Sequence, residues 1–162
     1  MSGPPAPARR RRKFLVVVDE TPESKVALRF AARRAEHTNG LVTLMYVIEP
    51  ADFQHWMAVE RVMREEAHRE AEAVLHDAAR DVNELTGITP ELVIKEGQKK
   101  EQLLELLKED RDISILVLGA GTGVEGPGPL VSLVASESAL SYPIPVTIVP
   151  GNLTEAQIDE LG

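Results

Sequence analysis

The sequence predicts an α/β fold in which a parallel sheet of five strands is covered by helices on both faces. Short apolar runs alternate with amphipathic stretches along the chain, which is typical of consecutive strand–helix–strand units. The runs "FLVVV" (14–18) and "ILVL" (115–118) are apolar at every position, as in strands that are buried on both faces. The run "ELVIKE" (91–96) has acids at its ends and a lysine within, as expected of an edge strand.

The individual elements follow in chain order from these patterns. The apolar runs that we assign to strands cover 14–19, 41–48, 91–96, 113–119 and 144–149. The stretches with helical apolar spacing cover 21–37, 56–85, 99–110 and 130–141. Thr21 suits the N-cap of the first helix and Pro22 its first position. The last strand is bracketed by prolines, which favours a margin of the sheet, and "TEAQIDEL" (154–161) adds a final helical turn.

Length and composition predict one globular domain with a tail at each end. The chain has 162 residues, of which 43% are hydrophobic and 27% charged. Residues 1–12 contain little except Pro, Ala and Arg, so we expect a disordered basic tail, then one domain over 13–151 and a C-terminal tail over 152–162. The run Arg9–Lys13 most simply keeps this tail solvated, although contact with anionic lipid or RNA is an alternative.

Charge and cysteine content exclude several classes of function. The run 9–13 supplies five of the 18 basic residues and 1–13 contains no acid, so the rest of the chain carries 13 basic and 26 acidic side chains. Such an acidic body repels phosphates, which argues against a nucleic-acid interface. There is no cysteine, hence no disulfide or thiolate site. No apolar run approaches the roughly 18 residues of a membrane span, and the apolar stretch 14–18 is too short for an export signal. We therefore expect a cytoplasmic protein without a membrane partner.

The final strand predicts a partner of a specific kind. An apolar strand at the edge of a sheet invites pairing with another chain unless something covers it. A second copy that pairs strand to strand is the simplest cover, so we expect a homodimer through Val146–Val149. The alternative is that the C-terminal tail, Asn152–Leu161, folds over this edge.

Two segments mark a candidate binding site at the carboxyl ends of the strands. Asp19 follows the first strand, where open α/β sheets bind their ligands, and its carboxylate suits an adenine or a ribose. The alternative is that Asp19 bonds the backbone of its own turn. After the fourth strand, "GAGTGVEGPGPLVS" (119–132) resembles the glycine-rich loops that cradle phosphates ahead of a helix.

The opening stretch "FLVVVDETPESKVALRFAARRA" is similar to that of universal stress protein domains, with an apolar strand, an Asp, a Ser and an Ala-Leu helix. The strand ends "LMYVI", "ILVLGAG" and "IPVTIVP" match as well, so the resemblance covers roughly residues 13–150. It implies an adenine nucleotide alpha hydrolase-like fold with strand order 3-2-1-4-5. It also implies a stress-response regulator, not an enzyme, whose adenine-nucleotide crevice lies between strands one and four.

The resemblance also implies site residues, with departures at the phosphate loop. An adenine pocket would use Val18, Asp19 and Val47. The family's loop reads Gly-x2-Gly-x9-Gly-Ser/Thr, and Gly119 fits its first position. Thr122 replaces the second glycine, with Gly123 one residue late, and Val131-Ser132 or Ser132-Leu133 replaces the Gly-Ser pair. The residues that we assign to a degenerate ATP or adenine-nucleotide crevice are Val18, Asp19, Val47, Gly119, Gly121, Gly123 and Ser132.

Pro127 and Pro129 weaken this site further, because they remove two amide donors. A loop that is purely structural, or that docks an unknown protein partner on a scaffold of the same fold, therefore stays open, as does a slow ATPase. The spacing of His68, Glu72 and His76 invites a metal site, but these residues lie opposite the apolar stripe of their helix, and we expect none.

Overall fold

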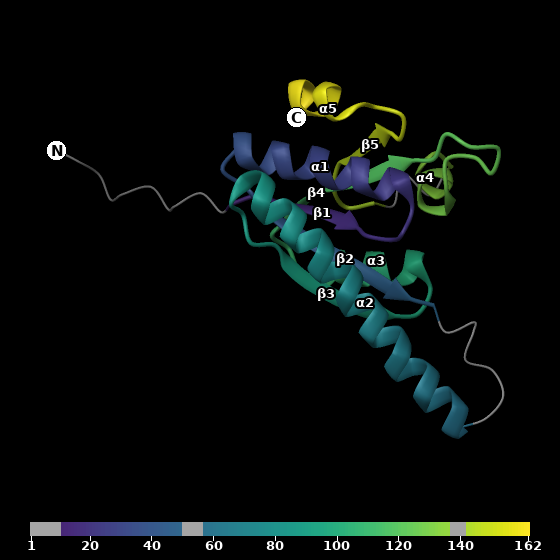
Figure 1. Ribbon diagram of the computed structural model, residues 1–162. Coiled ribbons are helices and arrows are strands. Elements are labelled where there is room, and N and C mark those ends of the chain that lie inside the picture. Colours follow the sequence, from purple (N-terminus) through teal and green to yellow (C-terminus); the bar gives the residue numbers. More distant parts are fainter. Residues whose placement is uncertain (1–10, 50–56, 137–141) are drawn as a thin grey trace.

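The computed structural model describes residues 11–49, 57–136 and 142–162, which form a parallel sheet flanked by helices (Figure 1). The strands of the described residues are β1 (Lys13–Val17), β2 (Leu41–Ile48), β3 (Glu91–Glu96), β4 (Ile113–Ala120) and β5 (Val146–Pro150). Their order is β3-β2-β1-β4-β5, and all pairs are parallel. This confirms the predicted order, with the polar strand β3 and the proline-flanked strand β5 at the two edges.

The helices form one layer on each side of the sheet. In the described residues they are α1 (Pro22–His37), α2 (Met57–Thr86), α3 (Lys99–Glu109), α4 (Pro129–Val134) and α5 (Glu155–Leu161). Helices α1 and α2 pack on one face against Phe14 and Val16, and α3 and α4 pack on the other against Leu15 and Val17. Neighbouring side chains of β1 thus face opposite cores, which is why the whole run is apolar.

The start of α1 is built as the sequence predicts. The hydroxyl of Thr21 accepts a hydrogen bond from the Ser24 amide and caps the helix, and Pro22 occupies its first turn. The amide of Asp19 in turn donates to the hydroxyl of Ser24, 3.1 Å away. These bonds fix the path of the chain as it leaves β1, so the position of the Asp19 carboxylate depends on the cap.

Two elements near the C-terminal end of the sheet differ from the sequence predictions. Helix α4 spans 129–134 and so begins at Pro129, not at 130; of the predicted remainder, 137–141 lies outside the described residues. Strand β5 begins at Val146 instead of residue 144, because Pro145 has no amide hydrogen and contributes only its carbonyl oxygen, which accepts from the Leu116 amide.

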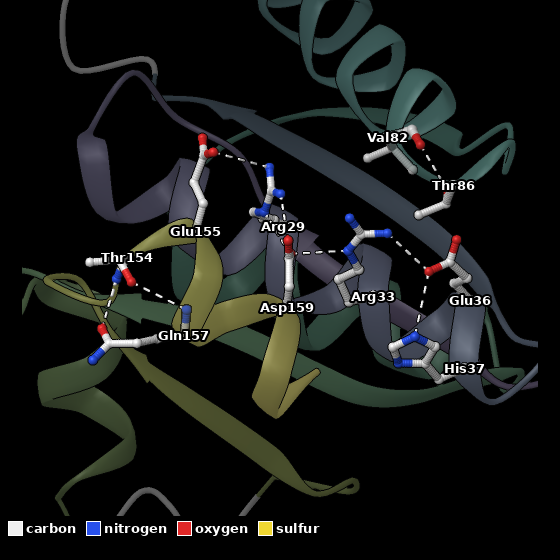
Figure 2. Close-up of polar contacts among 10 residues, drawn as sticks. All are labelled: Arg29, Arg33, Glu36, His37, Val82, Thr86, Thr154, Glu155, Gln157 and Asp159. Carbon is white, nitrogen blue, oxygen red and sulfur yellow. Dashed lines mark hydrogen bonds and ion pairs between the residues drawn. The ribbon is translucent and has the colours of Figure 1, made fainter.

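The segment after β5 forms a full helix rather than a single turn. A capping box starts α5: Thr154 and Gln157 each bond the other's backbone amide (Figure 2). Ile158 is buried, and Asp159 binds the guanidinium groups of Arg29 and Arg33 at 2.8 and 3.0 Å. Helix α5 therefore packs on α1.

Candidate functional site

The carboxyl ends of β1 and β4 are neighbours, as the binding-site prediction requires. Phe14 to Val16 of β1 pair with Ile115 to Val117 of β4, so the turns that follow the two strands meet at one edge of the sheet. A cavity of about 150 Å³ lies between them. Its walls are Val17, Asp19, Thr21, Glu23, Ser24, Lys99, Leu118, Gly119, Pro127, Gly128, Pro129, Leu130 and Val131. We call this the small cavity.

Gly119 has a structural reason to be glycine. A Cβ atom at this position would collide with the backbone carbonyl of Glu23 in the first turn of α1. The same turn lies against Gly121 and Gly151, where a Cβ would lie 3.2 Å from the Glu23 carboxylate and 3.1 Å from the Glu23 Cβ, respectively. These glycines thus allow α1 to approach the end of β4, a requirement that is independent of any phosphate.

The other predicted loop residues, Gly121, Gly123 and Ser132, lie outside the wall of the small cavity. The amide of Gly121 donates to the carbonyl of Pro127 at 3.0 Å, and the amide of Gly126 donates to that of Gly123 at 3.1 Å, so both are used within the loop. Gly123 is exposed and Ser132 is an exposed residue inside α4, and neither lines the small cavity. Ser132 does not cap α4 either, because Gly128 holds that position.

A second and larger cavity, of about 400 Å³, lies over the carboxyl ends of β1 and β2 under the side of α2. Its lining includes Val18, Asp19 and Val47, the three residues that the resemblance assigns to an adenine pocket. The remaining wall residues are Tyr46, Ile48, Glu49, Met63, Glu66, Ala67, Glu70 and Lys99. We call this the large cavity, and a volume of this size lies within the range of roughly 300–1,000 Å³ that is usual for small-molecule sites.

Asp19 lies where the two cavities meet and also serves its own turn. Its Oδ1 accepts hydrogen bonds from the amide of Thr21 at 2.8 Å and from the Thr21 hydroxyl. The alternative drawn from the sequence, a carboxylate that bonds its own backbone, is thus correct for Oδ1. Asp19 is only partly buried and lines both cavities, so it borders the space that a ligand would occupy.

Lys99 and Tyr46 belong to the site although the sequence analysis did not select them. Lys99 lines both cavities, and its Nζ lies 3.7 Å from Glu49. The sequence did contain a signal for Lys99. It opens α3, at the positive end of a helix where a cation is unfavourable, and stands three residues after the end of β3. Tyr46 precedes Val47 and gives the large cavity an aromatic wall.

The large cavity has an acidic environment. Burial raises the pKa of Tyr46, and the charges of Glu70, Glu20 and Asp19 raise it further, which keeps the phenol neutral. Glu20, next to Asp19, hydrogen-bonds Glu70, and this contact raises the pKa of the Glu20 carboxyl. Carboxyl groups are therefore crowded in and beside the wall of this cavity, where they repel one another.

The described structure has a further cavity and several polar groups away from these strand ends. A cavity of about 440 Å³ lies between α1 and α2, lined by Leu28 and Val82 among others, away from the strand ends. The described residues contain no group of three potential metal ligands. His68 lies 2.6 Å from Glu96 of β3. Among the described residues, no helix has the length and hydropathy that a bilayer crossing requires.

Comparison of the sequence with known proteins identifies one family. The model of the universal stress protein family matches residues 10–150. A curated universal stress protein from Mycolicibacterium smegmatis is 30% identical over 144 residues, which cover 86% of this chain and 48% of that protein. The chain thus spans about half the length of this relative.

Solved structures show the same fold. Universal stress protein UspA from Lactobacillus plantarum aligns with a TM-score of 0.71 at 20% identity, covering 87% of this chain and 99% of its own. A universal stress protein from Archaeoglobus fulgidus in complex with dAMP aligns with a TM-score of 0.59 at 19% identity, covering 87% of this chain and 99% of its own. At 20% and 19% identity, these two alignments show that the chain shares the fold of these proteins.

Proposed function

The chain belongs to the universal stress protein family, and we propose that it is a regulatory domain that binds an adenine nucleotide at the carboxyl ends of β1, β2 and β4. The observation that carries this proposal is the pair of cavities that share Asp19 and Lys99. The dAMP bound to the Archaeoglobus fulgidus protein supports the ligand class. Binding rather than catalysis is the proposed activity, and a cytoplasmic location stays a prediction.

The two cavities suit different parts of such a ligand. The large cavity has apolar walls at Val18 and Val47 and an aromatic wall at Tyr46, which suits a flat base. Asp19, between the cavities, is placed to accept hydrogen bonds from ribose hydroxyls. Lys99, which also faces both, provides a positive charge for a phosphate that enters the small cavity.

Isothermal titration with AMP tests the proposal. We expect saturable binding at submillimolar to millimolar concentration that Asp19→Ala abolishes. Asp19→Asn keeps a carbonyl oxygen for the Thr21 hydrogen bonds but removes the charge, so we expect weaker binding with little change in melting temperature. Glu160→Ala, an exposed change on α5, is the control and is expected to bind as the parent does. Equal affinity in the Asp19 variants, or no heat with any of them, would contradict the proposal.

We further propose that the protein is a homodimer through β5. Strand β5 pairs with β4 on one side, and its Ile148 side chain is 40% exposed. The C-terminal helix α5 packs on α1. This supports a second copy of the chain, in place of the C-terminal segment, as the element that pairs with the edge of β5.

One observation favours a second role, as a scaffold that docks a protein. Val124 is fully exposed at the tip of the loop after β4, between the rigid prolines of that loop and Gly123. An exposed apolar tip on a stiffened loop suits contact with an apolar patch of a partner. If a partner captured by the protein is lost on Val124→Ser and is insensitive to AMP, the scaffold role is favoured over nucleotide regulation.

A further inference from the structure

We infer that the crevice accepts adenosine and adenosine monophosphate and that each phosphate beyond the first weakens binding, so that AMP binds more tightly than ADP and ADP more tightly than ATP. This inference rests on the proposed function and specifies the ligand class of the same site. It follows from three features of the two cavities: their sizes, the hydrogen-bond donors of the loop, and the charges in their walls.

The first feature is the unequal size of the cavities. The large cavity, about 400 Å³, has the volume of a small-molecule site, whereas the small cavity, about 150 Å³, falls below the usual range of roughly 300–1,000 Å³. Val131 narrows the small cavity and cannot withdraw, because its side chain is buried in the core with Leu118. The space beyond Asp19 therefore suits one phosphate better than a chain of three.

The second feature is the shortage of donors where further phosphates would lie. Pro127 and Pro129 face the small cavity and have no amide hydrogen. In the adjoining part of the loop, outside the wall of this cavity, the amides of Gly121 and Gly126 donate to carbonyl groups of the loop itself. A triphosphate exposes many acceptor oxygens, and each one that loses water without gaining a donor weakens binding.

The third feature is the sign of the charge around the site. Asp19 and Glu23 line the small cavity, and Asp19, Glu49, Glu66 and Glu70 line the large one. Among the described residues that line the two cavities, Lys99 is the one cation, and Glu49 already lies 3.7 Å from its Nζ. Each further negative charge on a ligand therefore meets more repelling carboxylates than attracting cations in these walls.

Titration of adenosine, AMP, ADP and ATP under one low-salt condition with EDTA tests the ranking. We expect AMP to bind at least tenfold more tightly than ATP, with ADP between them, and we expect the ratio to shrink as salt is added. With Mg²⁺ present the same order holds with a smaller ratio, because the ion neutralises part of the triphosphate charge.

Variants that remove charge test whether the carboxylates in the cavity walls cause the preference for AMP over ATP. Glu66→Gln/Glu70→Gln is expected to narrow the AMP-to-ATP ratio severalfold. The control is Glu72→Gln/Glu84→Gln. It makes the same change in net charge at exposed positions of α2 outside both cavities, and we expect it to leave the AMP-to-ATP affinity ratio unchanged. Lys99→Met is expected to weaken AMP more than adenosine, because only AMP carries a phosphate for the lysine to bind.

The outcomes separate this inference from the proposed function. Two results overturn the charge ranking while the nucleotide site stands. One is ATP that binds at least as tightly as AMP. The other is a ratio of AMP affinity to ATP affinity that both double variants change equally. Failure of all four ligands to bind at millimolar concentration overturns the proposed function and the ranking together.

Discussion

At the scale of single residues, a glycine in the phosphate-loop motif is required for packing at Gly119, at the end of β4, but not at Gly123. Gly119 and Gly123 belong to the same loop motif, but a Cβ at residue 119 collides with Glu23 whereas a Cβ at 123 meets open space. We expect Gly119→Ala to lower the free energy of unfolding by about 1–3 kcal/mol, the usual cost of overpacking, and Gly123→Ala to change it little. Urea unfolding of both variants measures this. Equal stabilities would show that the α1–β4 contact relaxes freely.

The sequence predicts some residues of the candidate nucleotide site and misses others. Val18, Asp19 and Val47 were predicted to form one pocket, and the structure brings them together. Lys99 and Tyr46 were not selected, because they reach the cavities only through the way α3 and β2 end at the same edge of the sheet. The glycine loop suggested a phosphate site by composition, but composition does not show which amides are already bonded.

At the scale of elements, α5 attaches to α1 through a charged contact that titrates. Hydrogen bonds from Arg29, and then from Arg33, hold the pKa of the Asp159 carboxyl well below its ordinary value (Figure 2). A carboxyl whose pKa is lower in the folded state stabilises the fold above its unfolded pKa of about 3.9 and loses this contribution as the pH falls through the folded value.

We therefore expect Asp159→Asn to lower the melting temperature at pH 7, and the gap to the parent to close as the pH falls below about 4. Glu160→Gln, its exposed neighbour, is the control. Thermal unfolding between pH 7 and pH 2 measures both variants. A gap that persists unchanged at the lowest pH would mean that the arginine contacts of Asp159 do not stabilise the fold.

The elements themselves were predicted to different extents. Polarity predicts the two edge strands, because "ELVIKE" tolerates water and the run 144–149 is bracketed by prolines, and the structure places both at edges. The complete order 3-2-1-4-5 was implied by the family resemblance. The start of β5 was placed two residues early, because apolar Ile144 resembles a strand residue while its proline neighbours prevent pairing. The length of α5 was underestimated, because its stability comes from the capping box and from Ile158 packing on α1.

At the scale of the whole molecule, the proposed dimer makes a prediction about mass in solution. Ile148→Asp places a charge on the exposed face of β5 and is expected to convert a dimer to a monomer in light scattering. Val62→Asp, at a 49% exposed position of α2, is the control and is expected to stay dimeric. A parent protein that is monomeric at all concentrations, or a dimer that survives Ile148→Asp and dissociates with Val62→Asp, would contradict an interface at β5.

The central claim is that an adenine ligand binds where β1, β2 and β4 end. Amide chemical shifts of ¹⁵N-labelled protein, followed as AMP is added, test it most directly because they locate the ligand. The largest changes are expected at Val18, Asp19, Val47, Lys99 and Gly119. Changes concentrated between α1 and α2, at Leu28 and Val82, or no changes at millimolar AMP, would contradict it.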